Sequence, residues 1–386
     1  MTKVKFKKLK VLYVLGGVMN RGGIESFVMN YFRKIDKNKI HIDFIVHGFE
    51  EGVYDLEIKN TGSNIYNIPI KSENFKLNIV KIREILKNGS YDIVHSHMDA
   101  MNFFILKEAK KLKVPIRISH SHNTDHLTNN KIKYLINEYV RFSHRKYATS
   151  FMSCSTDAGN WLFGKNKPFI LIKNAIETEK FEFNSQKRLD LRKKYDIEDK
   201  LVIGNVGRFD YQKNHMYLIN VFEKIYEKNN NTVLFLIGEG HLKESIIKKI
   251  LNKDYYKNII FAGNKENVND FYNCFDIYCQ PSNFEGLGIV LIEAQINGLK
   301  CFASSNIPKE TNLFGTTTYL DIDSKSVEVW SSSIINYVEN KKNTRNFIKS
   351  EDIHSSQYSI KKESKKLEEI YLSLYSEVKN ENTIYN

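Results

Sequence analysis

Apolar residues occur along the chain in short runs that alternate with amphipathic stretches, a pattern that predicts strands alternating with helices. A β-rich apolar run ends at Gly16 and Gly17, and residues 22–35 then place apolar side chains at helical spacing. The pattern continues to residue 123, and each expected strand is short and ends at polar residues or glycine. Alternation of this kind is typical of a parallel sheet covered by helices on both faces. The other elements expected in this half are strands at 40–48, 64–70, 91–98 and 114–123 and a helix at 77–89.

A polar, charged stretch at residues 176–200 interrupts this pattern, and a strand at 201–209 restarts it. The second half therefore resembles the first, and the chain closes with one amphipathic helix at 359–380. The predicted class is α/β, with two doubly wound, Rossmann-like domains in series, which bind ligands where the carboxyl ends of their strands face each other. The other elements expected in the second half are strands at 232–240, 259–264, 276–282 and 300–305 and helices at 216–229, 242–251, 267–275 and 287–298. We place an N-terminal acceptor domain at 1–180, a C-terminal donor domain at 181–360, and a final helix and tail at 361–386.

Length and composition agree with a globular protein of two domains. The 386 residues exceed one ordinary core, and 41% apolar with 27% charged residues argues against extended disorder. The 58 basic residues against 45 acidic ones give a net charge of +13, which favours an anionic partner. A proteome rich in lysine and asparagine is the simpler explanation of this excess, so charge alone does not identify the partner.

The cysteines and the start of the chain indicate where the protein resides. The four cysteines form no CxxC pair and are typical of reduced thiols in a cytosolic protein. No small-residue cleavage site follows the basic start, and no stretch reaches the roughly 18 apolar residues that span a bilayer. We expect a cytoplasmic protein, and the lysines at its start are compatible with peripheral contact with an anionic membrane.

Two cations follow directly after an expected strand of the second half. Arg208 and Lys213 lie in the stretch NVGRFDYQKNH, at the carboxyl edge of the second sheet. A planar guanidinium and a mobile ammonium together suit a diphosphate. Taken alone, the two cations fit a solvated loop equally well, so the motif described next is needed to support a diphosphate site.

A second motif combines two glutamates with a glycine-rich turn. The segment Glu-Gly-Leu-Gly at 285–288 precedes a helix, where backbone N–H groups and the positive helix end favour an anion. Glu293 lies inside that otherwise apolar helix and needs hydrogen-bond donors, which ribose hydroxyls would supply. If the whole segment were helical, its two carboxylates would lie roughly 12 Å apart, which suits two ends of one elongated ligand. A glutamate on a solvated stripe of the helix is the alternative.

Two His-Ser-His triplets end neighbouring expected strands, His95 with His97 and His120 with His122. Because residues two apart point to the same face of a strand, a clustered metal site is geometrically possible. Polar residues at the strand ends of a sugar site explain the histidines as well. We expect no bound metal, and leave the metal site as the alternative.

These motifs resemble those of the retaining, nucleotide-sugar-dependent glycosyltransferases of family four over most of the chain. The stretch PSNFEGLGIVLIEA is the most specific, because its two glutamates with seven residues between them match the family's paired-glutamate motif. Within the family, the chain looks most like the subgroup that builds bacterial capsular polysaccharide or exopolysaccharide. The resemblance implies the GT-B fold of two facing Rossmann-like domains, with a C-terminal helix that packs back on the first. The other matching stretches are RGGIES, SHSHN, IKNAIE, NVGRFDYQKNH, LIGEG and FAGN.

The resemblance also implies a role for each matching residue of the second half. Arg208 and Lys213 would hold the donor diphosphate, and Glu293 would hold the ribose hydroxyls. Glu285 would lie at the hexose as a positioning and charge-stabilising group. The backbone amides near sugar and phosphate would be those of Gly286, Leu287 and Gly288.

Three further residues receive roles in the same way. Gly23 would let the backbone of the first domain approach the phosphate, and Asn264 would lie near the base. His122 matches a histidine that reaches the transferring sugar in relatives, although His120, two residues earlier, competes for that assignment.

We therefore expect a retaining hexosyltransferase that uses a nucleotide sugar, a UDP-sugar, and a lipid-linked or glycan acceptor in surface polysaccharide synthesis. We expect no metal or other cofactor. A sugar-nucleotide epimerase of the same two-domain shape is the nearest alternative. A dehydrogenase would need a G-x-G-x-x-G after the first strand, which the chain lacks. A nucleic-acid-binding protein would need a recognisable module, and none is present, so we expect no nucleic acid partner.

Overall fold

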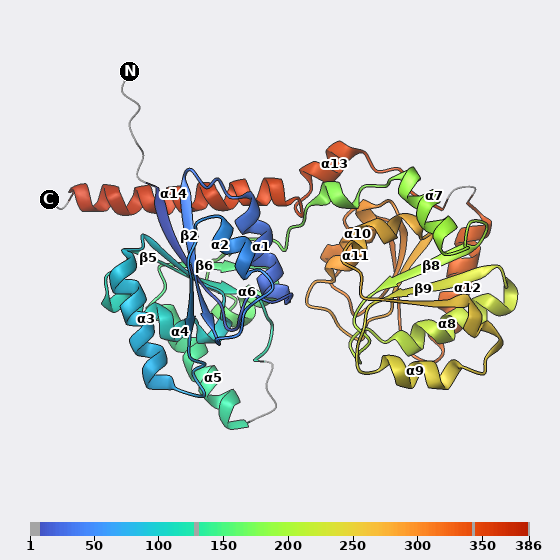
Figure 1. Cartoon of the computed structure of the whole chain (residues 1–386), viewed down its shortest axis with the longest axis horizontal. Helices are drawn as coiled ribbons and strands as arrows, with labels where there is room; N and C mark the ends of the chain where they lie inside the picture. The colour runs from blue at the N-terminus through green and yellow to red at the C-terminus, as the bar shows by residue number, and fades with distance from the viewer. Residues whose placement is uncertain (1–7, 127–130, 342–343, 385–386) are drawn as a thin grey trace, which may run out of the picture. The chain divides into compact units, whose positions relative to one another are not determined.

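The computed structural model describes residues 8–126, 131–341 and 344–384. The chain forms two compact units (Figure 1). The first comprises residues 1–176 together with 357–386, and the second comprises residues 177–356. The sequence placed the corresponding boundaries after residues 180 and 360. Because the chain returns to the first unit at its end, the second unit is inserted between two parts of the first.

The first unit is built on a seven-stranded sheet in which every strand is parallel to its neighbours. The strand order is β3-β2-β1-β4-β5-β6-β7, so the direction of winding reverses between β1 and β4. The strands are β1 Leu9–Val14, β2 Ile40–His47, β3 Ile65–Ile68, β4 Ile93–Ser96, β5 Ile116–Ser121, β6 Ser150–Ser153 and β7 Ile170–Leu171. The helices are α1 Gly23–Lys34, α2 Asp55–Asn60, α3 Phe75–Gly89, α4 Asn102–Lys111, α5 Lys131–Ser143, α6 Thr156–Phe163 and α14 Ile360–Ile384.

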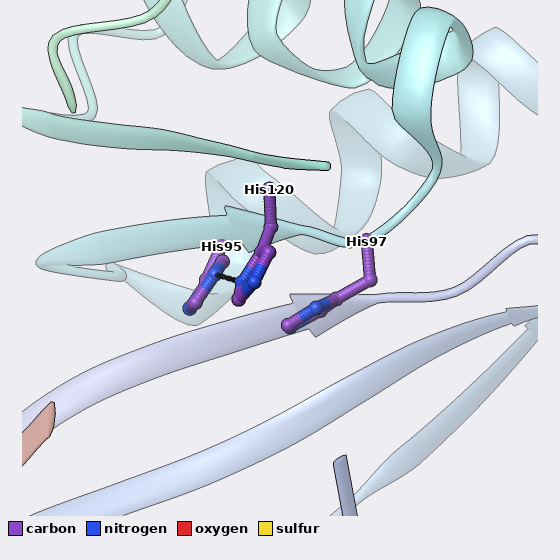
Figure 2. A group of neighbouring side chains, drawn as sticks. All are labelled: His95, His97 and His120. Atoms are coloured by element: carbon purple, nitrogen blue, oxygen red, sulfur yellow. Dashed lines mark hydrogen bonds between the residues drawn. The ribbon is translucent and has the colours of Figure 1, made fainter. Parts of the chain in front are cut away.

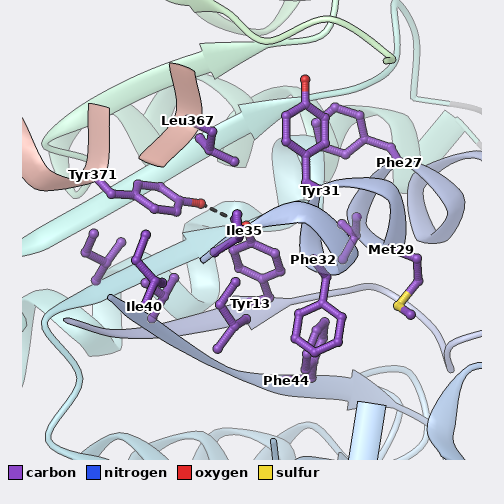
Figure 3. Packing of buried hydrophobic residues seen from close by; sticks show 14 of the residues in the cluster. Tyr13, Phe27, Met29, Tyr31, Phe32, Ile35, Ile40, Phe44, Leu367 and Tyr371 are labelled. Atoms are coloured by element: carbon purple, nitrogen blue, oxygen red, sulfur yellow. Dashed lines mark hydrogen bonds between the residues drawn. The ribbon is translucent and has the colours of Figure 1, made fainter. Parts of the chain in front are cut away.

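Helices cover both faces of this sheet because alternate residues of each strand are apolar on opposite sides. In β1, Val11 and Tyr13 pack into the cluster that α1 and α14 complete, whereas Leu12 and Val14 pack into the cluster formed with α3 and α4. Figure 3 shows the first cluster, where Tyr371 of α14 lies beside Tyr13 with 3.0 Å between their hydroxyl oxygens. The C-terminal helix therefore returns to the first unit, as the resemblance implied.

The second unit repeats the plan with a six-stranded parallel sheet, in the order β10-β9-β8-β11-β12-β13. Its winding reverses between β8 and β11, which brings the loops after these two strands to one place. The strands are β8 Leu201–Val206, β9 Thr232–Ile237, β10 Ile259–Gly263, β11 Ile277–Gln280, β12 Lys300–Ser304 and β13 Thr317–Leu320. The helices are α7 Ser185–Lys194, α8 His215–Lys228, α9 Lys243–Ile250, α10 Val268–Phe271, α11 Ile289–Ile296, α12 Ser326–Glu339 and α13 Ser350–Ser355.

The structure departs from the expected elements where the apolar pattern is weak or short. Helix α7 lies inside the charged stretch at 176–200, where Arg188 and Arg192 both pair with Asp276 and Leu191 packs against an apolar cluster. Helix α11 begins at Ile289, so Glu285 lies outside it, and the roughly 12 Å separation that assumed one continuous helix does not apply to Glu285 and Glu293. Further elements lie beyond the strand expected at 114–123, among them α5, α6, β6 and β7.

Candidate functional site

The loops that follow β8 and β9 lie against each other at the carboxyl edge of the second sheet. Gly238 has a φ of +139°, and a methyl group added there would lie 2.1 Å from the carbonyl oxygen of Gly207. Only glycine permits this approach. The contact fixes the loop that carries Arg208, whose side chain is 72% exposed and donates from Nε to Oδ2 of Asp210 at 2.7 Å.

Glu285 lies in the loop before α11, where four side chains donate to its carboxylate. Oε1 accepts hydrogen bonds from Lys213 Nζ at 2.7 Å, Gln280 Nε2 at 2.8 Å and Ser282 Oγ at 2.6 Å. Oε2 accepts from Gln212 Nε2 at 3.1 Å. The Glu285 side chain is only 6% exposed, so its charge is stabilised by the ion pair with Lys213 and by these amide and hydroxyl donors.

The second glutamate of the motif, Glu293, lies one turn into α11 and has a different environment. Burial raises the pKa of its carboxyl group to about 7, and the hydrogen bond from Tyr272 and the positive charge of Lys213 oppose that rise. The Tyr272 hydroxyl donates to Oε2 at 2.7 Å. Lys213 therefore acts on both glutamates, and Glu293 is the one whose charge changes near neutral pH.

A glycine-rich turn leads from Glu285 into α11. Gly288 has a φ of +88° and caps the helix without a side-chain hydrogen bond, so the first amides of α11 are not covered by a capping side chain. A methyl group added at Gly286 would meet nothing within 4 Å. The turn is therefore an open, amide-rich corner suited to an anion.

In the first unit, four histidines stack where β4 and β5 end. His95 Nε2 lies 2.9 Å from His120 Nδ1, the bond that Figure 2 marks, and His97 Nδ1 lies 2.9 Å from His122 Nε2. The ring planes of His95 and His120 differ by 9°, and those of His120 and His122 by 17°. The Tyr371 hydroxyl bonds the remaining nitrogen of His95 at 2.5 Å, so α14 is tied to this stack.

Burial keeps all four imidazoles neutral. It lowers the pKa of His122 to about 3, and it holds the pKa values of His95, His97 and His120 well below their usual range. The Nε2 atoms of His97 and His120 have no hydrogen-bond partner among the described residues.

This stack bears on the metal site that the sequence left open. Nitrogens of His95, His97 and His120 lie within 4.8 Å of one another, which is close enough to share an ion. A metal would require three lone pairs that converge on one point at about 2.0–2.1 Å. In the hydrogen bond between His95 and His120, one ring nitrogen donates its N–H to the lone pair of the other, so that lone pair is not free to bind an ion. The present geometry is that of a hydrogen-bonded stack, and the absence of a metal stays a prediction.

The two histidines that competed for one assignment differ in accessibility. His120 is fully buried, whereas His122 is partly exposed and pairs with His97, which lines a cavity at the carboxyl edge of the sheet. The backbone N–H of His122 donates to Asp99 Oδ1 at 2.7 Å, which anchors this strand end.

Comparison with known protein families assigns both halves of the chain to glycosyltransferases. Residues 21–180 match the family model described as Glycosyltransferase Family 4, and residues 187–352 match the model described as Glycosyl transferases group 1. A relative from Bacillus subtilis (strain 168), "Putative glycosyltransferase EpsF", is 33% identical over 352 residues, which are 88% of this chain and 90% of the relative. The chain belongs to glycosyltransferase family 4.

Other relatives and solved structures agree with this membership. "Capsular polysaccharide biosynthesis glycosyltransferase CapH" of Staphylococcus aureus is 27% identical, over 95% of this chain and 99% of the relative. The structure of Anabaena Alr3699/HepE in complex with UDP superimposes with a TM-score of 0.74 and 14% identity, covering 95% of this chain and all of that one. The structure of TarM superimposes with a TM-score of 0.69 and 13% identity, and the match covers 97% of this chain and all of TarM.

As a member of family 4, the protein is a glycosyltransferase of polysaccharide biosynthesis, and its two units have the GT-B fold. This membership decides against the epimerase that the sequence left open.

The glycosyltransferase structure brings together some of the predicted site residues in the second unit. Lys213 and Glu285 bond directly, and the charge of Lys213 reaches Glu293. Arg208 pairs within its own loop, and Asn264 is exposed directly after β10. The turn residues Gly286, Leu287 and Gly288 lie between Glu285 and the start of α11.

Two predicted residues of this family 4 enzyme lie in the first unit. Gly23 is the first residue of α1, where an added methyl group would meet nothing within 4 Å, and His122 follows β5. The roles given to all of these residues remain predictions.

Sequence reasoning missed four residues that bond to the two glutamates of the family motif. Gln212, Gln280 and Ser282 lie inside or beside the quoted motifs, so a search for neutral donors near Glu285 would have found them. Tyr272 is 21 residues from Glu293, and no sequence signal connects the two.

Proposed function

We propose that the protein transfers a hexose, with retention of configuration, from a UDP-sugar to a lipid-linked or glycan acceptor during surface polysaccharide synthesis. The observation that carries the proposal is that Lys213 bonds Glu285 and acts by its charge on Glu293, beside an open glycine-rich helix start. This arrangement offers a cation and backbone amides to a diphosphate, with a carboxylate on either side for hydroxyl groups.

The charges of the second unit suit departure of a nucleoside diphosphate. In that step, negative charge grows on the phosphate oxygens and positive charge grows on the anomeric carbon. Arg208 is 72% exposed and has room to turn from Asp210 to a phosphate. The amides of Gly286, Leu287 and Gly288, at the positive end of α11, would stabilise the same charge. No proton transfer is needed for this stabilisation.

We assign Glu285 to positioning and charge stabilisation at the hexose. Its Oε1 already accepts three hydrogen bonds, which makes that oxygen a poor nucleophile. Glu293, whose Oε2 is held by Tyr272, would accept hydrogen bonds from the ribose hydroxyls. Asn264 would lie near the base.

The first unit would contribute a backbone turn and a histidine. Gly23 leaves open space at the start of α1, where the backbone of the first unit could approach a phosphate. His122, neutral and partly exposed, would donate a hydrogen bond to the transferring sugar.

Names of relatives support the choice of donor and acceptor. Anabaena Alr3699/HepE has been solved in complex with UDP-glucose, with 13% identity to this chain. A relative from Escherichia coli, 22% identical over 97% of this chain, is named "UDP-Gal:alpha-D-GlcNAc-diphosphoundecaprenol alpha-1,3-galactosyltransferase".

A lipid-linked acceptor would require the protein to work at a bilayer surface, and we propose peripheral contact with anionic lipid. Among the described helices, none is both long and apolar enough to cross a membrane. Helix α5 presents an apolar face to solvent, with Ile132 71%, Leu135 70% and Tyr139 70% exposed. The excess of basic residues would attract this face to anionic headgroups, by about 1 kcal/mol for each nearby lysine. The lysine-rich segment 1–7 lies outside the described residues.

A nucleotide-release screen across sugar donors tests the proposed function. Purified protein, a panel of nucleotide sugars and a lipid-linked acceptor should release UDP, and Lys213→Ala and Glu293→Ala should each lower the rate on the order of a hundredfold. Lys224→Ala and Glu227→Ala, which break an exposed pair on α8, are matched controls and should leave the rate unchanged. Equal turnover by the site variants and the controls would refute the assigned site, and release of no nucleotide from any donor would refute the function.

A further inference from the structure

A pocket of about 390 Å³ lies at the carboxyl edge of the first unit's sheet, outside the residues assigned to the donor. Four adjacent strands contribute to it, in the order β3, β2, β1 and β4. Most of the residues that line it follow or end these strands, among them Gly17, His47, Lys71 and His97, whereas Glu25 comes from the first turn of α1. A cavity of this size is typical of a site for a small molecule.

Lys71 brings a positive charge to this pocket without a counter-ion. Its ammonium lies 5.0 Å from the ring centre of Phe104, and among the described residues no carboxylate lies within ion-pairing distance of it. Burial lowers its pKa to about 7, because a desolvated ammonium without an anionic partner is unfavourable. An anion bound in the pocket would supply the missing partner.

The two acids that line the pocket do not supply it, because each is engaged elsewhere. Asp99 accepts hydrogen bonds from the backbone N–H of His122 at 2.7 Å and from the side chain of Asn123 at 2.7 Å. The Glu25 carboxylate folds back over the start of its own helix, where a methyl group on Gly22 would lie 2.1 Å from its Oε2.

Two histidines add neutral hydrogen-bonding atoms to the pocket. His47 is 4% exposed, and its Nδ1–H donates to the carbonyl oxygen of Leu15 at 2.7 Å, so its Nε2 is an acceptor. That Nε2 has no partner among the described residues, nor does the Nε2 of His97, which is 1% exposed. Two buried, unpartnered nitrogens beside an unpaired cation indicate a ligand with hydroxyl groups and a negative charge.

We propose that this pocket binds a phosphate-bearing acceptor sugar, with the phosphate on Lys71 and sugar hydroxyls on His47 and His97. The proposal rests on the proposed function and decides between its two acceptor classes, because a lipid-linked sugar diphosphate carries this phosphate and a plain glycan does not.

The test supplies one acceptor sugar in two forms, as an undecyl diphosphate and as the phosphate-free undecyl glycoside. Wild-type protein should use the diphosphate with a kcat/KM about ten- to a hundredfold higher. Lys71→Met keeps the side-chain stem and should remove that preference by raising the KM for the diphosphate acceptor, while the KM for the donor stays unchanged. Lys107→Met is the matched control, because Lys107 also lies over a phenylalanine, 5.4 Å from the ring centre of Phe103, and does not line the pocket.

The outcomes separate this proposal from the proposed function. Turnover with equal use of both acceptor forms, or a preference that survives Lys71→Met, would overturn the phosphate site and leave the transferase function standing. Release of no nucleotide with any acceptor would overturn both. Inorganic phosphate and phosphatidylglycerol vesicles serve as competitors. If either inhibits turnover at a concentration below the KM for the diphosphate acceptor, and Lys71→Met abolishes that inhibition, Lys71 binds a free anion or a lipid headgroup instead.

Discussion

Lys213 and the two glutamates of the motif have distinct electrostatic states. Glu285 is ion-paired and accepts four hydrogen bonds, so its geometry is set before any ligand arrives. Glu293 has one hydrogen bond from Tyr272 and a pKa near 7, so its charge depends on pH and on what binds next to it. The first glutamate is suited to hold a sugar in place, and the second is suited to respond to a donor.

This difference predicts how donor binding depends on pH. Burial raises the Glu293 pKa from its ordinary value to about 7, so the group is mostly protonated at pH 6 and mostly ionised at pH 8. Ribose hydroxyls donate best to the ionised form, so the affinity for UDP-glucose should fall about tenfold from pH 8 to pH 6. Isothermal titration with UDP-glucose measures this, because its diphosphate does not titrate in that window.

The Glu293→Gln variant should bind UDP-glucose more weakly than wild type at pH 8, and its affinity should not change between pH 6 and pH 8. Glu227→Gln, on the exposed face of α8, should keep the wild-type slope of affinity against pH. A slope unchanged in Glu293→Gln would assign the titration to another group.

Among individual residues, the sequence predicted the charged members of the site and missed the neutral side chains that donate hydrogen bonds to the two glutamates. Lys213 and Glu285 could be predicted because each lies in a recognisable motif, yet their 2.7 Å bond joins residues 72 positions apart. That contact depends on β8 and β11 being neighbours in the sheet, which is a property of strand order. Tyr272 precedes β11 and Glu293 lies in α11 after it, so their contact depends on how these elements pack, which the sequence does not show.

Among the elements, α14 completes the core of a unit that begins more than 300 residues earlier in the chain. Leu367 is 1% exposed in the cluster with Tyr13, whereas Leu372 on the same helix is 40% exposed. Leu367→Ala should therefore lower the free energy of unfolding by about 2–4 kcal/mol. Leu372→Ala, the same change in the same helix, should alter it by less than about 0.5 kcal/mol.

Urea unfolding followed by circular dichroism measures both variants. Hydrogen exchange at β1, in the first unit, and at β8, in the second, then shows which unit has lost stability. Only the first unit should be affected, because α14 packs there. Similar losses in the two variants would mean that α14 does not pack on β1 in solution.

Elements with a strong apolar period were predictable and others were not. The helix expected at 359–380 is present as α14, Ile360–Ile384. Helix α7 carries three basic residues in its last turn and no apolar stripe, so its contacts with Asp276 had no counterpart in the pattern. Strand β7 has two residues, which is too short for any period to appear.

For the molecule as a whole, the sequence predicted two doubly wound parallel sheets because the alternation of elements runs through both halves. It did not predict the strand orders, which depend on packing between residues far apart in the chain. The resemblance added the return of the C-terminal helix, which no periodicity could have placed on β1.

The exposed apolar face of α5 predicts binding to anionic membranes. Wild-type protein should float with phosphatidylglycerol liposomes and stay in the lower fraction with phosphatidylcholine alone. Leu135→Asp with Tyr139→Asp should reduce flotation several-fold, because both side chains are 70% exposed and would place charge in the acyl boundary. Leu189→Asp, at a 61% exposed leucine of α7 in the second unit, is the control and should leave flotation unchanged. Protein that never floats would remove the membrane proposal.

The return of α14 to the first unit sets an order of events on the ribosome. Tyr13 and Tyr371, whose hydroxyls meet in the finished protein, are synthesised 358 residues apart, with the entire second unit between them. The second unit is continuous in sequence and can fold as it emerges, whereas the face of the first sheet that α1 covers only in part waits for α14 to be synthesised. The first unit is therefore completed after the second, and the part of its β1 face that α14 later covers is the surface that a chaperone would meet on the nascent chain.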